Sequence, residues 1–260
     1  MIVAGIDIGA ATAKAVLLNG NTMLSSCVIP TGESVALAAE SVMRSTLDRT
    51  DLSLSEIDYI VATGYGRRAV TFAHEAITEI SCHAKGANLL YPLAHTVVDI
   101  GGQDSKVIEI DEKGNIVNFA MNDKCAAGTG RFLEVMARVL NAEIEEIGSL
   151  SLKGDDPCQI SNTCTVFAES EMISLRAEGK SRENILAGIH SAMAHRIAIM
   201  GNPIGFKSQI IFTGGVARNI GMKKALQDRI GEEITVADNP QIIGALGAAI
   251  IAAKKQGHSI

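Results

Sequence analysis

Residues 2–28 read IVAGIDIGAATAKAVLLNGNTMLSSCV, and residues 95–120 read HTVVDIGGQDSKVIEIDEKGNIVNFA. In both segments an apolar run ends in Asp-Ile-Gly, and a lysine follows seven residues after the aspartate. The two pairs are Asp7 with Lys14 and Asp99 with Lys106. A glycine turn then precedes a further apolar run, as in a meander of antiparallel strands. Because motif, offset and turn all recur, the sequence predicts an internal duplication rather than two unrelated hairpins.

Helical patterns lie between and after these strand segments. Apolar residues recur at helical spacing in 34–47, 131–140 and 185–200. Strand triplets with intervening helices predict an α/β protein with two similar lobes that face a nucleotide cleft. The expected lobes are 1–92, completed by a C-terminal helix at 242–260, and 93–241, which carries the cysteines discussed below.

Composition excludes several functional classes. The net charge is −6, aromatic residues make up 3% and tryptophan is absent, which argues against a nucleic-acid-binding surface. No apolar run approaches the ~18 residues of a membrane span, and the N-terminal apolar run lacks the features of a signal peptide. We therefore expect a cytoplasmic protein. The five cysteines contain no Cys-x-x-Cys pair, which fits neither a disulfide framework nor a zinc ribbon.

Three glycine turns follow predicted strands, at 9–12, 101–103 and 214–216. A glycine at the end of a strand lets backbone N–H groups approach phosphate oxygens, and Asp7 and Asp99 can reach the ligand shell of Mg²⁺. The third turn suits the ribose or adenine of a nucleotide. An ordinary tight turn explains any one of them, but three in this order indicate a nucleotide site. A Walker A loop is absent from the sequence.

These motifs resemble those of a known superfamily. DIGxxxxK, DIGGQDxK and TGGVARN resemble the phosphate-1, phosphate-2 and adenosine motifs of actin, heat-shock-70 proteins and sugar kinases. TGYGR (63–67), EISCHAKGA (79–87), MNDKCAAGTGRFLEVMA (121–137) and CTVFAESEMIS (164–174) resemble the ATP-dependent activators (component A) of 2-hydroxyacyl-CoA dehydratases, which are related to subunits of benzoyl-CoA reductase. Ala10 stands where this family usually has serine, a change that removes a hydroxyl but no backbone donor.

The resemblance implies an actin-like, ribonuclease H-like ATPase fold with Mg²⁺ and ATP or ADP as ligands. The residues expected to bind the nucleotide are Gly9, Ala10, Ala11, Thr12, Lys14, Gly101, Gly102, Gln103, Gly128, Thr129, Gly130, Gly214, Gly215, Val216, Asn219 and Gln241. Catalysis is expected from Asp7, Asp99 and Gln103, with Gln103 orienting the hydrolytic water by analogy with GTPases.

Two cysteines come shortly before predicted helices: Cys125 before 131–140, and Cys164 before a helix near Phe167. A thiolate at a helix N-terminus is stabilised by the helix dipole, which lowers its pKa. The other cysteines favour a structural role: Cys27 lies in a strand pattern, Cys158 in a loop, and Cys82 beside His83 in a predicted helix. His190 and His195 are five residues apart, so a place on the helix surface is favoured over a shared metal.

Two thiolates are half of the four that a 4Fe-4S cubane needs. The economical solution is a homodimer in which each chain supplies Cys125 and Cys164 to one shared cluster, and the resemblance implies the same arrangement. The function expected is ATP-driven transfer of one electron from ferredoxin or flavodoxin to a partner iron–sulfur dehydratase or double-cubane-type reductase. The alternatives are a sugar or small-molecule kinase, for which no catalytic carboxylate stands out, and a nucleotide-gated scaffold without redox chemistry.

Overall fold

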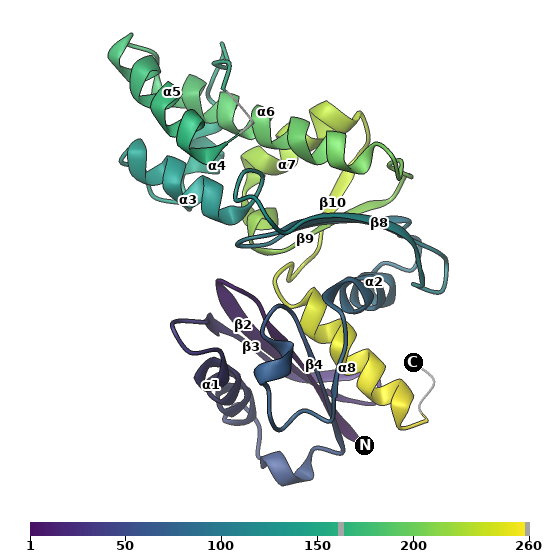
Figure 1. The fold of residues 1–260 in the computed structure, drawn as a ribbon. Coiled ribbons are helices and arrows are strands. Elements are labelled where there is room, and N and C mark those ends of the chain that lie inside the picture. The colour runs from purple at the N-terminus through teal and green to yellow at the C-terminus, as the bar shows by residue number, and fades with distance from the viewer. Residues whose placement is uncertain (161–163, 258–260) are drawn as a thin grey trace. The chain divides into compact units, whose positions relative to one another are not determined.

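The computed structural model describes residues 1–160 and 164–257. It divides into two compact units, each built on one mixed sheet (Figure 1). The first unit contains residues 1–94, 110–117 and 238–260, and the second contains 95–109 and 118–237. Residues 161–163, which directly precede the second cysteine motif, lie outside the described residues, as do the last three residues of the predicted C-terminal helix. The lobe boundaries expected from the sequence stay a prediction.

The sheet of the first unit has the strand order β3-β2-β1-β4-β5. Its strands are β1 (Ile2–Ile8), β2 (Thr12–Asn19), β3 (Thr22–Pro30), β4 (Tyr59–Thr63) and β5 (Glu75–Ala76). β1, β2 and β3 form the antiparallel meander that the sequence predicts, and β4 runs parallel to β1. The helices are α1 (Val35–Leu47), α2 (Glu79–Leu90) and α8 (Ile243–Lys255), with short 3₁₀ turns η1 (Leu54–Glu56) and η2 (Arg67–Ala69).

Glycines allow α2, α8 and β1 to touch backbone to backbone. A Cβ atom on Gly5 of β1 would lie 1.9 Å from the carbonyl oxygen of Ala245 in α8. A Cβ atom on Gly247 of α8 would lie 1.7 Å from the carbonyl oxygen of Cys82 in α2. No side chain fits at either position without separating these elements. The close contact brings α2 and α8 side by side (Figure 1), and α8 packs against β1.

The sheet of the second unit has the strand order β10-β9-β6-β7-β8. Its strands are β6 (Thr96–Ile100), β7 (Ser105–Ile110), β8 (Ile116–Asn122), β9 (Ile210–Thr213) and β10 (Ile234–Val236). β6 is antiparallel to β7 and parallel to β9. The helices are α3 (Gly130–Val139), α4 (Ile147–Ser151), α5 (Thr165–Ala177), α6 (Arg182–Gly201) and α7 (Ile220–Ile230), with the 3₁₀ turn η3 (Gly215–Arg218).

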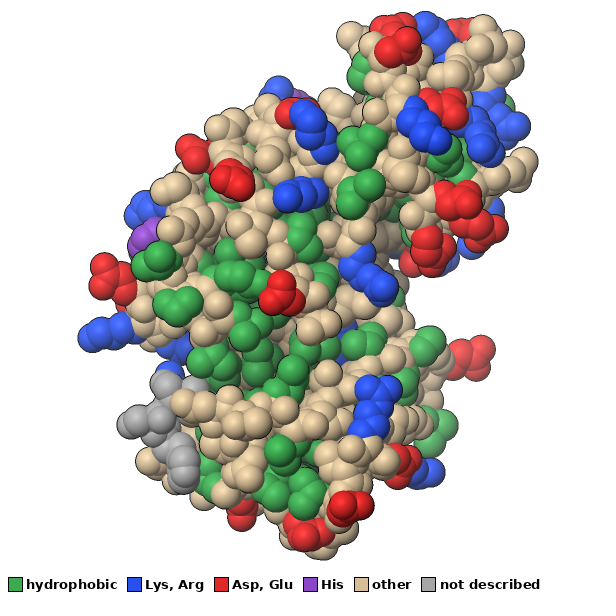
Figure 2. All heavy atoms as spheres, turned by 180° about the vertical axis from the view of Figure 1, so that it is seen from behind, with side chains coloured by type: hydrophobic (Ala, Val, Ile, Leu, Met, Phe, Trp, Pro, Cys, Tyr) green, Lys and Arg blue, Asp and Glu red, His purple; other side chains and the backbone are tan. Residues whose placement is uncertain are grey.

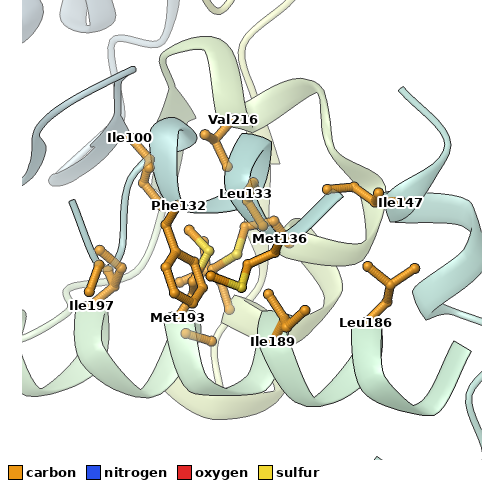
Figure 3. Packing of buried hydrophobic residues seen from close by; sticks show 14 of the residues in the cluster. Ile100, Phe132, Leu133, Met136, Ile147, Leu186, Ile189, Met193, Ile197 and Val216 are labelled. Atoms are coloured by element: carbon orange, nitrogen blue, oxygen red, sulfur yellow. The ribbon is translucent and has the colours of Figure 1, made fainter. Parts of the chain in front are cut away.

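A continuous apolar core joins α3 and α6 in this unit. Phe132 and Met136 of α3 point toward Ile189 and Met193 of α6 (Figure 3), and all four side chains are buried. Burying one such side chain contributes about 1.5–3 kcal/mol. Ile100, at the end of β6, belongs to the same cluster. The core therefore fixes the start of α3 relative to the end of β6.

The strand registers confirm the internal duplication. Asp7 lies opposite Lys14 across β1 and β2, as Asp99 lies opposite Lys106 across β6 and β7. The parallel neighbour extends the match, because Asp7 pairs in register with Thr63 and Asp99 with Thr213. The two units thus share one strand arrangement around an Asp-Lys pair.

Charged side chains of both signs are spread over the visible surface (Figure 2). Lys and Arg side chains alternate with Asp and Glu over the face in Figure 2, so no single-sign charge dominates that face. Among the helices described, none is both long and apolar enough to cross a membrane.

Candidate functional site

In the first unit, a buried aspartate and a lysine face each other where β1 ends and β2 begins. Asp7 is 5% exposed, and the Nζ atom of Lys14 lies 3.3 Å from its Oδ2 atom. Between them in sequence is a tight turn, closed by a hydrogen bond from the Gly9 N–H to the Thr12 carbonyl (3.0 Å). Ala10 and Ala11, at the tip of this turn, are exposed. The structure therefore brings the first predicted set of phosphate-binding residues to one end of the sheet.

The second unit repeats this arrangement with more partners. Lys106, which is 1% exposed, lies 3.1 Å from Asp99 Oδ2 and 2.8 Å from Asp104 Oδ1. The Thr213 hydroxyl donates to Asp99 Oδ1 (2.9 Å). Gly101 closes the same kind of turn by donating to the Asp104 carbonyl (2.9 Å). Both oxygens of Asp99 are thus held within the sheet.

Carbonyl groups of the two turns accept hydrogen bonds from different elements. In the first turn, Thr31 at the end of β3 donates its hydroxyl to the Gly9 carbonyl (2.8 Å) and its N–H to the Ala11 carbonyl (3.0 Å). In the second turn, the Gly101 carbonyl accepts from the Gly130 N–H and the Gly102 carbonyl from the Arg131 N–H, both at 2.8 Å. The start of α3 is therefore bonded directly to the second turn, while Gln103 at its tip stays exposed.

A left-handed glycine follows β4 and β9 at equivalent places. Gly64 has φ +84° and Gly214 has φ +87°. A Cβ atom on either would come within 2.6 Å of a carbonyl oxygen, of Ile8 or of Ile100. TGYGR and TGGVARN were expected to be separate motifs, but Thr63-Gly64 repeats Thr213-Gly214. The signal was the shared Thr-Gly after an apolar run.

Several other predicted nucleotide-binding residues also have structural roles. Val216 is buried in the core, so only its backbone can face a ligand, while Gly215 is exposed. The Asn219 side chain caps α7 by accepting from the Met222 N–H (2.9 Å). Gly128 has φ +90°, and a Cβ atom there would lie 3.1 Å from Arg196. Thr129 is the residue that precedes α3, and Gln241 lies just before α8.

The two candidate cluster cysteines have different settings. Cys164 is the N-cap residue of α5, as expected. Cys125 does not stand at the start of α3: it lies five residues earlier, in a loop held by the Asn122 side chain, which donates to the Cys125 carbonyl (2.8 Å). The helix begins at Gly130, within one residue of the predicted start at Arg131, and its first two N–H groups bond to the second turn rather than to the Cys125 loop.

Both thiols are free and half-buried. Within the described residues, no three His, Cys, Asp or Glu side chains are grouped to hold a metal ion on their own.

The remaining cysteines and His190 are structural. Cys27 and Cys82 are buried, and burial raises the pKa of the Cys82 thiol to about 12, so it stays protonated. Burial also raises the pKa of the Cys158 thiol. His190 is 1% exposed, which makes its predicted place on the helix surface wrong, and burial lowers its pKa to about 4. Its Nδ1 atom lies 2.9 Å from the Leu186 carbonyl oxygen.

Comparison with known proteins identifies the family. The profile of the BadF/BadG/BcrA/BcrD ATPase family matches residues 4–252. The chain belongs to this family of ATP-hydrolysing enzymes. It is 44% identical to the 2-hydroxyisocaproyl-CoA dehydratase activator of Clostridioides difficile over 253 residues, which cover 97% of this chain and 95% of the relative.

Solved structures show the same fold. The (R)-2-hydroxyglutaryl-CoA dehydratase component A of Acidaminococcus fermentans superposes with a TM-score of 0.95 at 40% identity, over 99% of both chains. The activator from Clostridium difficile with bound ADPNP superposes with a TM-score of 0.93 at 43% identity, over 100% of this chain and 98% of that one. A ROK family glucokinase from Streptomyces griseus, at 14% identity and a TM-score of 0.59, shares the fold alone. This ATPase therefore has the predicted actin-like α/β fold.

Proposed function

We propose that this ATPase is an activator that couples ATP hydrolysis to the transfer of one electron into a partner iron–sulfur enzyme. The partner is a 2-hydroxyacyl-CoA dehydratase or a related reductase, and the donor is ferredoxin or flavodoxin. Support comes from relatives named as dehydratase activators that align over almost the whole chain. The kinase alternative has only the fold likeness to a glucokinase in its favour.

The nucleotide-binding part of the proposal rests on the duplicated turns. The turns at 9–12 and 101–103 place exposed backbone beside Asp7 and Asp99, which can hold Mg²⁺ through its water ligands. Lys14 is beside the first turn and can approach a phosphate oxygen. Gln103, exposed at the tip of the second turn, is proposed to orient the hydrolytic water.

The redox part rests on Cys125 and Cys164. Each chain of a homodimer would supply both thiolates to one shared 4Fe-4S cluster. When bound, such a cluster stores and releases one electron. The half-buried thiols suit this role, and α5 starts directly after Cys164, so the positive end of its dipole lies beside the proposed ligand.

One observation carries the coupling between the two parts. The carbonyls of Gly101 and Gly102 accept from the N–H groups of Gly130 and Arg131, which follow Cys125 by five and six residues. A nucleotide that shifts the second turn must therefore pull on α3 and on the end of that loop. The reduction potential of a one-electron centre changes by 59 mV for each ~1.4 kcal/mol of coupling free energy. A small strain on the Cys125 loop would therefore change the potential of the proposed cluster measurably.

Cysteine substitutions test the cluster. We expect wild-type protein purified without oxygen to be brown, to absorb near 400 nm, and to contain about two irons and two sulfides per chain. Cys125→Ser and Cys164→Ser each remove a thiolate ligand and should lose this iron, as measured by iron and sulfide analysis.

The matched controls are Cys27→Ser and Cys158→Ser, which alter thiols outside the proposed ligand set and should keep the iron. Iron retained in both the Cys125→Ser and Cys164→Ser variants would overturn the cluster assignment. Colourless wild-type protein that transfers phosphate from ATP to a sugar would favour the kinase alternative.

A further inference from the structure

The two duplicated aspartates differ in how their carboxylates are held. Asp99 is fixed by its own sheet, with Lys106 on Oδ2 and the Thr213 hydroxyl on Oδ1. Asp7 has the equivalent lysine, Lys14, on Oδ2, but at a slightly longer 3.3 Å. Thr213 completes the arrangement in the second unit, but its counterpart in the first unit has different contacts.

Thr63 occupies the place of Thr213, in register with Asp7 on the neighbouring strand. Its hydroxyl is buried, and within the described residues it makes no hydrogen bond to Asp7. The Thr63 hydroxyl lies instead near the Cys82 thiol of α2. The sheet of the first unit therefore holds Asp7 less completely than the sheet of the second holds Asp99.

Helices α2 and α8 supply another neighbour for Asp7. A Cβ atom on Gly244, at the start of α8, would lie 2.9 Å from Asp7 Oδ2 and 3.0 Å from the Nε2 atom of His83 in α2. The two atoms therefore flank the same small space, each within 3.0 Å of one point. His83 is 6% exposed, so its ring is enclosed beside the carboxylate.

The packing of the helices explains why a histidine reaches this place. A Cβ atom on Gly86 would lie 2.2 Å from the Ile243 carbonyl oxygen, so α2 meets the start of α8 without an intervening side chain. His83 is three residues before Gly86 and thus lies on the same face of α2. The absence of a side chain on Gly244 then leaves the space open between imidazole and carboxylate.

We propose that His83 is a positioning residue for Asp7: its Nε2 atom orients the carboxylate across the space left by Gly244, in place of the threonine that orients Asp99. This inference rests on the proposed function, in which Asp7 holds nucleotide-bound Mg²⁺. Lys14 and His83 would both hold the Oδ2 atom of Asp7. The Oδ1 atom is then directed past Gly64, where a Cβ atom would lie 2.3 Å from it. Groups that orient a metal-holding carboxylate typically change metal affinity 10–100-fold when removed.

The test measures metal binding rather than turnover. Mn²⁺ replaces Mg²⁺, and its affinity for the ADP-bound protein is titrated by the EPR signal of free Mn²⁺. We expect His83→Ala to weaken Mn²⁺ binding at least 10-fold, and His83→Gln, which keeps a hydrogen-bond donor, to restore part of the loss. ADP affinity in the presence of EDTA should stay within twofold of wild type, because the nucleotide contacts are intact.

Gly244→Ala is the second arm of the experiment. Its methyl group enters the space between Asp7 and His83, both of which meet it with side-chain ends that can move. Alanine also favours a helix by about 1 kcal/mol over glycine, so this variant should fold. It should weaken Mn²⁺ binding in the same direction as His83→Ala. The matched control is His74→Ala, which removes another imidazole of the first unit and should leave Mn²⁺ affinity unchanged.

Wild-type Mn²⁺ affinity in both His83→Ala and Gly244→Ala would overturn the proposal. An equal loss of metal-free ADP affinity would also overturn it, because His83 would then support the unit as a whole. If His83→Ala fails to fold, Gly244→Ala decides. Wild-type protein that binds no nucleotide would contradict the proposed function itself, a result distinct from any difference between variants.

Discussion

At the scale of single residues, the same Asp-Lys pair has two environments. The Lys106 side chain is 2% exposed, whereas that of Lys14 is 13% exposed and lies next to the open turn at Gly9. An ammonium group that is nearly excluded from water depends on its carboxylates far more than one that solvent can reach. The two aspartates are therefore expected to be equally necessary for ATP hydrolysis but unequally necessary for stability.

We predict that Asp7→Ala and Asp99→Ala both abolish ATP hydrolysis, while Asp99→Ala costs more stability. Removing one member of a buried pair typically costs 3–5 kcal/mol, but Lys106 keeps Asp104. The expected loss is about 2–4 kcal/mol for Asp99→Ala and about 1 kcal/mol for Asp7→Ala. Urea unfolding of the nucleotide-free protein measures both.

The control for this comparison is Asp228→Ala, which removes an exposed ion pair with Lys224 and should change stability by less than about 1 kcal/mol. If Asp7→Ala and Asp99→Ala lost the same free energy of unfolding, the difference in burial would not govern stability as predicted.

The sequence predicts residues at this scale only where a motif marks them. Asp7, Lys14, Asp99 and Lys106 stand out because the same spacing occurs twice. Thr31 and His83 carry no such signal. Thr31 contacts the first turn, and His83 lies near Asp7, through packing between segments that are distant in sequence. Gly244 is recognisable only from the space it leaves.

At the scale of elements, the link between the second turn and α3 has the clearest consequence. Helices usually leave their first N–H groups to a capping side chain, to water or to a ligand. In α3, two such groups donate to Gly101 and Gly102, and Thr129 makes no side-chain cap. Periodicity predicts the helix itself well, but not the loop before it. Loop 123–129 is held by the Asn122 side chain, which donates to the Cys125 and Ala127 carbonyls, and no periodic pattern marks such bonds.

We predict that Arg131→Pro uncouples the nucleotide from the cysteine loop. Proline lacks the N–H that bonds to Gly102, yet it is tolerated in the first turn of a helix. In wild-type protein, iron should be removed by a chelator at different rates with ADP and with ATP. In Arg131→Pro the two rates should become equal, as followed by the loss of absorbance near 400 nm.

Arg131→Ala is the matched control. It loses only the surface ion pair with Glu134 and keeps the backbone N–H, so the two chelation rates should still differ. Equal rates already in the wild-type protein would argue that the turn does not transmit the nucleotide state. Far-ultraviolet circular dichroism checks that helix content is retained in both variants.

At the scale of the whole molecule, duplication followed by divergence explains how the units differ. Both units keep the Asp-Lys ladder, the tight turn and the left-handed glycine. In the first, the turn is tied to Thr31 at the end of β3, whereas in the second it is tied to α3, beyond the loop that carries Cys125. The insertion of this loop and of α5 after Cys164 gives only one unit the candidate cluster ligands.

The exposed face of α5 points to what the proposed dimer buries. Val166 and Phe167, two and three residues after Cys164, are 65% and 63% exposed. Adjacent apolar side chains left in solvent are typical of an interaction surface. A second chain that shares the cluster must approach Cys164, so it is placed to cover both side chains.

We predict that removing the iron weakens the dimer at least 10-fold, because a shared cluster is part of the interface and binds only the associated state. Sedimentation velocity over a range of concentrations, before and after chelation without oxygen, measures the dissociation constant. Cys158→Ser protein should behave as wild type in both conditions, whereas Cys164→Ser should resemble chelated wild type from the start. A monomer that carries a complete 4Fe-4S cluster would refute the bridging arrangement. A dimer equally tight with and without iron would show instead that apolar contacts such as those of Val166 and Phe167 hold the chains together alone.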